Sequence, residues 1–263
     1  MESWKTAVSY SDEDQIWIRG EAITSLMANA SFTDVVFLLH HGRRPTNDER
    51  HLLDAILIAV SDHGPGSPSA AASRLVASAN RKAPEAAVAA GVLAIGDMHA
   101  GAGLACMEMI DAGLEIARRE SIGIPEAARR IVQESIQEKK RLPGFGHRVH
   151  SLDPRTPLLF GMARDSKLAG VGIEFVSAVE KAARELIKPL PINIDGALAA
   201  VLYDLGFPPL FGKFVFIIGR VAGLTAQVME EYTRERPMRI KIPVQYDGIK
   251  PHANGANGSN GQH

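Results

Sequence analysis

The chain has 263 residues, 46% of them apolar, and is long enough to bury a sizeable core in one large domain or two modest ones. Its 29 basic and 30 acidic residues nearly cancel, which argues against a nucleic-acid partner. A single cysteine, Cys106, excludes an intrachain disulfide, and we find neither an apolar signal core nor a charge-free run of membrane-spanning length, so we expect a cytoplasmic protein without a membrane partner.

Hydrophobic periodicity predicts helices along almost the whole chain, and hence an all-α fold. Residues 15–23 are the exception and predict one small hairpin. Thr46 and Glu49 form a capping box after Pro45, which predicts a helix start there. The expected helices cover residues 46–62, 67–80, 83–96, 103–120, 124–142, 172–188, 195–206 and 213–232, of which the last is the most apolar.

The middle of the chain is more charged than the segments on either side of it. We therefore expect a smaller helical domain, residues 101–195, inserted into a larger helical domain made of residues 1–100 and 196–250. The cleft between the two domains is then the expected ligand site. Residues 251–263 form a polar tail rich in Asn and Gly, which we expect to be disordered.

Two histidines stand at predicted helix ends. His63 precedes a Gly-Pro-Gly reversal, and taken alone it indicates a cation near the negative end of the preceding helix. His99 precedes a glycine-rich helix start, where the positive end of the helix dipole favours a neutral imidazole. A neutral imidazole can polarise a carbonyl group, and the alternative is a histidine that only packs or caps.

The loop "RLPGFGHRVHSLDPR", residues 141–155, separates two helical segments. Its glycines allow a ligand to approach the backbone closely. Arg148 and Arg155 supply forked donors that suit carboxylates and phosphates. A solvated basic loop is the alternative, but such a loop does not need this glycine pattern.

Three further charged residues stand out. Asp195 lies in the first turn of an apolar helix, where a lone aspartate usually serves as the N-cap. Arg220 interrupts a very apolar helix, and burying an arginine is costly unless it meets an anion. Arg236 falls in an exposed turn before Pro237.

Together these groups fit an aldol-type reaction on a thioester. A carboxylate would remove a proton from the α-carbon while a donor stabilises the enolate oxygen. A second donor would activate the acceptor carbonyl, and arginines would hold a di- or tricarboxylate.

The motifs "DHG", "GDMHAGAG", "PGFGHRV", "DPR", "NIDG" and "GR…ERP", in this order, resemble the citrate synthase superfamily and within it the citryl-CoA lyase group, over roughly residues 10–248. The resemblance implies an all-helical fold with a large and a small domain that close over the substrates. It also implies a homodimer or higher homo-oligomer and a coenzyme A thioester, acetyl-CoA or citryl-CoA, as substrate. No metal is expected.

By this resemblance, Asp195 would be the base at the methyl group of acetyl-CoA, and His99 would stabilise the enol. His147 would polarise the ketone of oxaloacetate, or accept the hydroxyl proton of citryl-CoA during cleavage. Further residues would bind the substrate carboxylates or line the pocket, with the last of them reaching across from the partner subunit: His63, Arg155, Phe216, Arg220 and Arg236. The remaining set would contact coenzyme A: Pro143, Gly144, Phe145, Gly146 and Arg148.

The chain also departs from the family pattern. Ala100 replaces the first of two glycines after His99, and the segment between His147 and Asp153 is one residue shorter than in synthases. The chain is shorter than typical citrate synthases as well. These features favour a citryl-CoA lyase, which cleaves citryl-CoA reversibly to acetyl-CoA and oxaloacetate. The alternatives are a citrate or methylcitrate-type synthase, and a non-catalytic partner subunit that binds coenzyme A esters.

Overall fold

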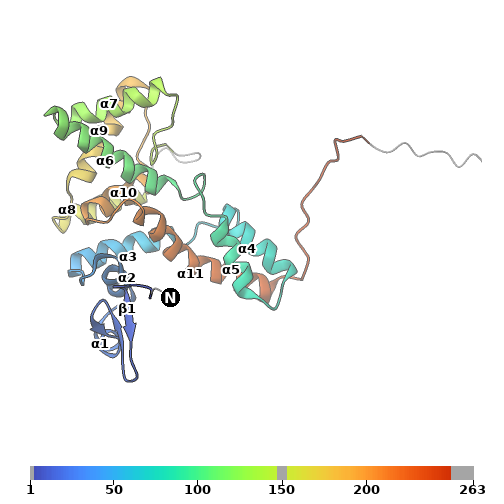
Figure 1. The fold of residues 1–263 in the computed structure, drawn as a ribbon. Coiled ribbons are helices and arrows are strands. Elements are labelled where there is room, and N and C mark those ends of the chain that lie inside the picture. Colours follow the sequence, from blue (N-terminus) through green and yellow to red (C-terminus); the bar gives the residue numbers. More distant parts are fainter. Residues whose placement is uncertain (1–2, 147–152, 250–263) are drawn as a thin grey trace, which may run out of the picture.

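The computed structural model describes residues 3–146 and 153–249, which form a mostly helical molecule (Figure 1). Three short strands are β1 (Ser9–Ser11), β2 (Ile16–Ile18) and β3 (Glu21–Ala22). The helices are α1 (Ile23–Asn29), α2 (Phe32–His41), α3 (Asn47–Ser61), α4 (Pro68–Ala79), α5 (Pro84–Leu93), α6 (Ala102–Glu120), α7 (Ile124–Gln137), α8 (Arg155–Asp165), α9 (Val171–Leu186), α10 (Ile194–Asp204) and α11 (Phe211–Arg234). The expected all-helical fold class is confirmed.

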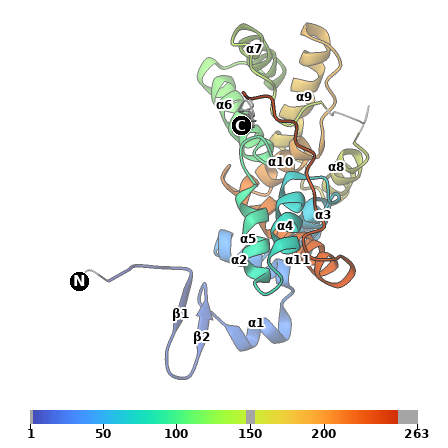
Figure 2. The same cartoon turned by 90° about the vertical axis from the view of Figure 1, so that its right-hand side faces the viewer.

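The strands form the hairpin that residues 15–23 predicted. β2 and β3 are antiparallel, with Trp17 opposite Ala22, and β1 adds a third strand that was not expected. Figure 2 shows the hairpin standing away from the helical body.

All eight expected helices are present. α3 begins with the predicted capping box, in which Glu49 donates its backbone N–H to Thr46 Oγ1 (3.2 Å) and accepts the N–H of Thr46 on its carboxylate (2.7 Å). The prediction missed α1, α2 and α8. A capping box of Ser31 and Asp34 starts α2, while α8 has Pro157 in its first turn, where a proline is tolerated.

α11 is the central helix of one half of the molecule and packs against α3, α4, α5 and α6. By length and composition it could cross a membrane, but half of its most apolar stretch is buried within the fold, as in the core helix of a globular protein. Gly219 and Gly223 bring α3 very close, since a Cβ at Gly219 would lie 2.6 Å from Val60 Cγ2. This close packing sets the end of α3 beside Arg220.

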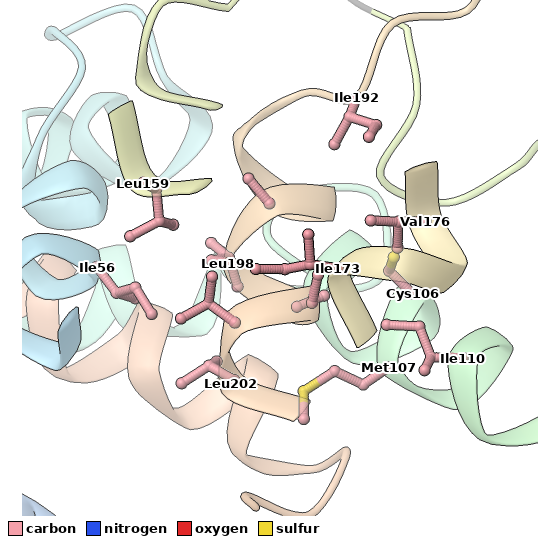
Figure 3. Packing of buried hydrophobic residues seen from close by; sticks show 14 of the residues in the cluster. Ile56, Cys106, Met107, Ile110, Leu159, Ile173, Val176, Ile192, Leu198 and Leu202 are labelled. Atoms are coloured by element: carbon pink, nitrogen blue, oxygen red, sulfur yellow. The ribbon is translucent and has the colours of Figure 1, made fainter. Parts of the chain in front are cut away.

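α6, α7 and α9 pack on one another in the other half, and α10 lies between them and the helices α3 and α8 (Figure 1). Figure 3 shows the core at this junction, where Leu198 and Leu202 of α10 lie near Ile56 and Leu159. The same core continues to Cys106 and Met107 of α6 and to Ile173 of α9. The expected domain boundaries at residues 101 and 195 remain a prediction, and the expected disordered tail, residues 251–263, lies outside the described residues.

Candidate functional site

A pocket of about 630 Å³ lies between the two segments that the sequence assigned to separate domains. From the larger segment it is lined by residues that include His63, His99, Phe216 and Arg220. From the smaller segment it is lined by Asp153, Pro154, Arg155, Asn193, Ile194 and Asp195. Six of the predicted site residues therefore meet at one place: His63, His99, Arg155, Asp195, Phe216 and Arg220.

Arg220 forms the floor of this pocket and is only 1% exposed. Its Nε donates to the carbonyl of Val60 (3.0 Å), its Nη1 to Ser69 Oγ (3.2 Å) and its Nη2 to His63 Nδ1 (2.8 Å). Its guanidinium carbon also lies 4.6 Å from the centre of the Phe216 ring. All these hydrogen-bond partners are uncharged, and the charges of Asp62 and Asp195 partly oppose the burial that lowers the pKa of Arg220. A buried cation so placed favours an anionic ligand.

His63 is a neutral acceptor in this arrangement. A guanidinium can only donate, so the contact with Arg220 Nη2 requires a lone pair on His63 Nδ1. Burial lowers the pKa of His63 below its ordinary value, and the charges of Arg220 and Arg155 lower it further. The reading of His63 as a cation at a helix end is therefore wrong.

His99 lies in a tight loop before α6, where Gly96 and His99 exchange two backbone hydrogen bonds (2.9 and 3.2 Å). Its Nε2 is 3.0 Å from Ser69 Oγ. The pKa of His99 lies below its ordinary value mainly because of burial, and then because of the charges of Arg220 and His63. The expected neutral imidazole is thus supported, although burial rather than the helix dipole is the main cause.

Ser69 Oγ lies between Arg220 and His99. It accepts from Arg220 Nη1 and keeps one hydrogen and one lone pair, so it can donate to His99 Nε2 or accept from it, depending on the tautomer of His99. With Ser69 as the donor, His99 holds its own proton on Nδ1, where it is available to a ligand. The sequence did not single out Ser69, because a serine in a first helical turn resembles a cap. Ser67 is the actual cap of α4.

Arg155 opens α8 and makes its strongest contacts with Asp153. Its Nε and Nη2 donate to the two carboxylate oxygens (3.0 and 2.8 Å), and its Nη1 donates to the carbonyl of Ala59 (3.0 Å). A guanidinium has five N–H groups, so two remain for a ligand. Burial works against ionisation of Asp153, but the hydrogen bonds from Arg155 outweigh it and its pKa lies below the ordinary value.

Asp153 also accepts the backbone N–H of Ile194 (3.2 Å), which joins Arg155 to the start of α10. The cap of α10 is Asn193, whose Oδ1 accepts the N–H groups of Asp195 (2.9 Å) and Gly196 (3.2 Å). Asp195 is therefore not the cap that a lone aspartate would suggest. It lines the pocket, and its charge adds to the burial that raises the pKa of Cys106.

The segment from Pro143 to Gly146 packs against the start of α10. Gly144 and Gly146 have positive φ angles of 83° and 77°, and a Cβ at Gly144 would lie 2.6 Å from Gly196 Cα. The carbonyl of Gly144 accepts the N–H of Asn193 (3.0 Å), and the carbonyl of Gly146 accepts Asn193 Nδ2 (2.8 Å). Gly144 thus has a packing role that the sequence did not predict.

The rest of the predicted set is not brought into this pocket. Pro143 and Phe145 are half-buried beside it, and their contact with coenzyme A stays a prediction. Arg236 is exposed in the turn after α11, away from the pocket of its own chain. His147 and Arg148 lie outside the described residues. Within 3–146 and 153–249, no group of three or more His, Cys, Asp or Glu side chains is placed to hold a metal ion.

Comparison with known proteins gives consistent relatives. The family model described as citrate synthase, C-terminal domain, matches residues 42–241. A citrate synthase from Heyndrickxia coagulans is 30% identical over 210 residues, which are 76% of this chain and 52% of that protein. The chain thus spans about half the length of this curated relative.

Two solved structures are similar over almost all of this chain. The structure of citryl-CoA lyase from Hydrogenobacter thermophilus has a TM-score of 0.87 and 37% identity, and the match covers 95% of this chain and 96% of that one. ATP citrate lyase from Methanothrix soehngenii, in complex with citrate and coenzyme A, has a TM-score of 0.77. That match covers 94% of this chain and 42% of the other, and at 21% identity it shows the fold alone.

Proposed function

Because the chain belongs to the citrate synthase family, we propose that it is a citryl-CoA lyase, an enzyme that reversibly cleaves citryl-CoA to acetyl-CoA and oxaloacetate. The observation that carries this proposal is the convergence of one carboxylate, two neutral imidazoles and a buried arginine on a single pocket. The similarity to a citryl-CoA lyase over nearly the full length of both chains supports it.

In the cleavage direction, the carbon–carbon bond between the hydroxyl-bearing carbon and the α-carbon of the thioester breaks. We propose that His147 accepts the proton of the hydroxyl group. The ketone of oxaloacetate then forms as the carbon–carbon bond breaks. His99 donates its Nδ1–H to the oxygen of the enolate that forms on the other fragment. Asp195, protonated at this stage, then delivers a proton to the terminal carbon and yields acetyl-CoA.

The substrate carboxylates belong beside the cations of the pocket. The guanidinium of Arg220 and the ring of His63 would bind one carboxylate. Arg155 would bind another through the N–H groups that do not contact Asp153 or Ala59. The backbone of residues 143–146 and the side chain of Arg148 are assigned to coenzyme A. Phe216, whose ring centre lies 5.7 Å from that of His99, forms an apolar wall beside the reacting carbons.

The proposed unit is a cytoplasmic homodimer in which Arg236 of each chain serves the pocket of the other. This explains why Arg236 is exposed and distant from its own pocket. Mixed dimers of one His147→Ala chain and one Arg236→Ala chain test the sharing. They should recover activity at one of their two sites, and no recovery would count against a shared site.

The second candidate is a citrate synthase, favoured by the 30% identity to the Heyndrickxia coagulans enzyme. A synthase must also hydrolyse the citryl thioester. Two assays separate the candidates: citryl-CoA is supplied and oxaloacetate measured, and acetyl-CoA with oxaloacetate is supplied and free coenzyme A measured. A lyase releases oxaloacetate in the first assay without rapid release of coenzyme A in the second. Rapid release would make the synthase the better assignment.

A further inference from the structure

A fully buried carboxylate lies near the end of α11, far along the helix from Arg220. Glu231 has no exposed surface and is held by two arginines. Arg239 donates from Nε (2.9 Å) and Nη2 (2.5 Å) to its two oxygens, and Arg74 Nη2 lies 2.9 Å from Oε2. A buried carboxylate is costly unless it is paired in this way, so the cluster fixes these side chains to one another.

The cluster holds the turn that follows α11. Arg239 follows the turn, and its Nε also lies 3.0 Å from Oε2 of Glu235, the residue that precedes Arg236. The backbone N–H of Met238 donates to the carbonyl of Ser78 in α4 (2.9 Å). Arg81 Nη2 donates to the carbonyl of Glu235 (2.5 Å). The backbone is therefore anchored on both sides of Arg236.

Arg236 itself contrasts with this anchoring. Its side chain is exposed, and within the described part of the chain it forms no ion pair. An arginine that only faces solvent does not require a fixed backbone. An arginine that must meet a carboxylate on another subunit benefits from one, because a preorganised donor loses less conformational entropy on binding.

We infer that Glu231 is a positioning residue for Arg236: through Arg239 it fixes the turn that presents the Arg236 guanidinium to the substrate carboxylate in a second copy of the chain. This inference rests on the proposed function, which assigns Arg236 to the pocket of the partner. It adds that the affinity for the carboxylate substrate depends on a buried ion cluster that touches no substrate.

The test removes the anchor and leaves Arg236 in place. Arg239→Ala is the main variant, because Glu231 keeps its contact with Arg74, and Glu231→Gln is the second. Arg234→Ala is the matched control, since Arg234 is an exposed arginine on the same helix end whose ion pair within the described residues is with Glu230 alone. Hydrogen exchange of the backbone amide of Met238, which donates to the carbonyl of Ser78, reports the anchoring without any assay of activity.

We expect faster exchange of the Met238 amide in Arg239→Ala and Glu231→Gln, and no change in Arg234→Ala. The KM for citryl-CoA should rise about tenfold in the first two variants with kcat nearly unchanged. This is the effect expected when a contact that binds the substrate and the transition state equally is lost. In an Arg236→Ala background, Arg239→Ala should add no further rise, because both changes remove the same contact.

Exchange as slow in Arg239→Ala as in the wild type would overturn the anchoring. A KM that rises in Arg236→Ala but not in Arg239→Ala, or effects that multiply in the double variant, would overturn the positioning role. Absence of citryl-CoA turnover by the wild-type protein would instead refute the proposed function, and the exchange data separate these failures.

Discussion

Ser69 places its hydroxyl oxygen 3.0 Å from His99 Nε2, and the same oxygen accepts a hydrogen bond from Arg220. The proposed mechanism requires Ser69 to donate to this nitrogen, so that His99 carries its proton on Nδ1. In Ser69→Ala the imidazole is free to carry its proton on Nε2, where it cannot serve the enolate oxygen. We expect kcat for citryl-CoA cleavage to fall about 10- to 100-fold, as for a weakened oxyanion donor.

Ser73→Ala is the control for this prediction. Ser73 lies in the same helix, is equally buried, and donates to the carbonyl of Ala87 (2.8 Å), outside the pocket. Its loss should lower the free energy of unfolding by about 1 kcal/mol and leave kcat unchanged. Equal effects of the two variants on kcat would contradict the role of Ser69.

Ala100 has a φ angle of 71°, a left-handed conformation that is unfavourable for an alanine. This strain costs about 1–2 kcal/mol, whereas a glycine adds about 0.5–1 kcal/mol of unfolded-state entropy. Ala100→Gly should therefore raise the free energy of unfolding by about 0.5–1 kcal/mol, as measured in urea. Ala105→Gly, inside α6, should lower it by a similar amount, and a loss of stability in both variants would contradict the strain at Ala100.

Alanine substitutions at Gly144 and Gly146 distinguish the effect of close packing on stability from the effect of backbone strain. Both have positive φ angles, but only at Gly144 would a Cβ overlap the backbone of Gly196; at Gly146 it would meet Leu190 at an ordinary 3.6 Å. Thermal unfolding should show a loss of about 2 kcal/mol or more for Gly144→Ala and about 1 kcal/mol for Gly146→Ala. Losses of the same size would show that the contact with α10 is not tight.

The lowered pKa values of His63 and His99 predict how stability depends on pH. In the unfolded chain these histidines bind protons near pH 6.5, while in the folded chain they bind them only at lower pH. Their contribution to the free energy of unfolding is therefore fully present above about pH 6.5. It is lost as the pH falls through their lower pKa values in the folded chain. Burial lowers the pKa of His40 and His41 in the same direction.

Urea unfolding at a series of pH values checks this dependence. The free energy of unfolding should decrease from about pH 6.5 downward, and the decrease should be smaller in His99→Gln, which cannot take up that proton. Stability that increases on acidification through this range would contradict the neutral state of these histidines.

The fold and much of the site could be predicted because their signals are local. Helical periodicity, the capping box at Thr46 and the prolines near helix starts identified eight helices, although the helix expected over residues 124–142 ends at Gln137. The missed α8 has little amphipathic pattern and an early proline, so its sequence reads as a continuation of the loop before it. The resemblance to the citrate synthase family is confirmed by the family model.

The contacts that tune the site were not predictable, because they join residues far apart in the chain. Arg220 reaches Val60, Ser69 and His63 only because the glycines of α11 admit α3. Nothing near Ser69 in the sequence indicates that its hydroxyl is shared. Asp153 was noted only as part of the "DPR" motif, and the hydrogen bonds that it accepts from the Arg155 side chain and from the N–H of Ile194 require the folded chain.

The release of oxaloacetate from citryl-CoA by the wild-type protein and by Asp195→Asn tests the account most directly. Asp204→Asn, at the other end of the same helix, controls for stability, because Asp204 only accepts backbone N–H groups at the start of α9. We predict rapid release by the wild type and by Asp204→Asn, and release slowed about 10²- to 10⁴-fold in Asp195→Asn. Undiminished release by Asp195→Asn would contradict the assignment of this pocket as the place where the carbon–carbon bond is broken.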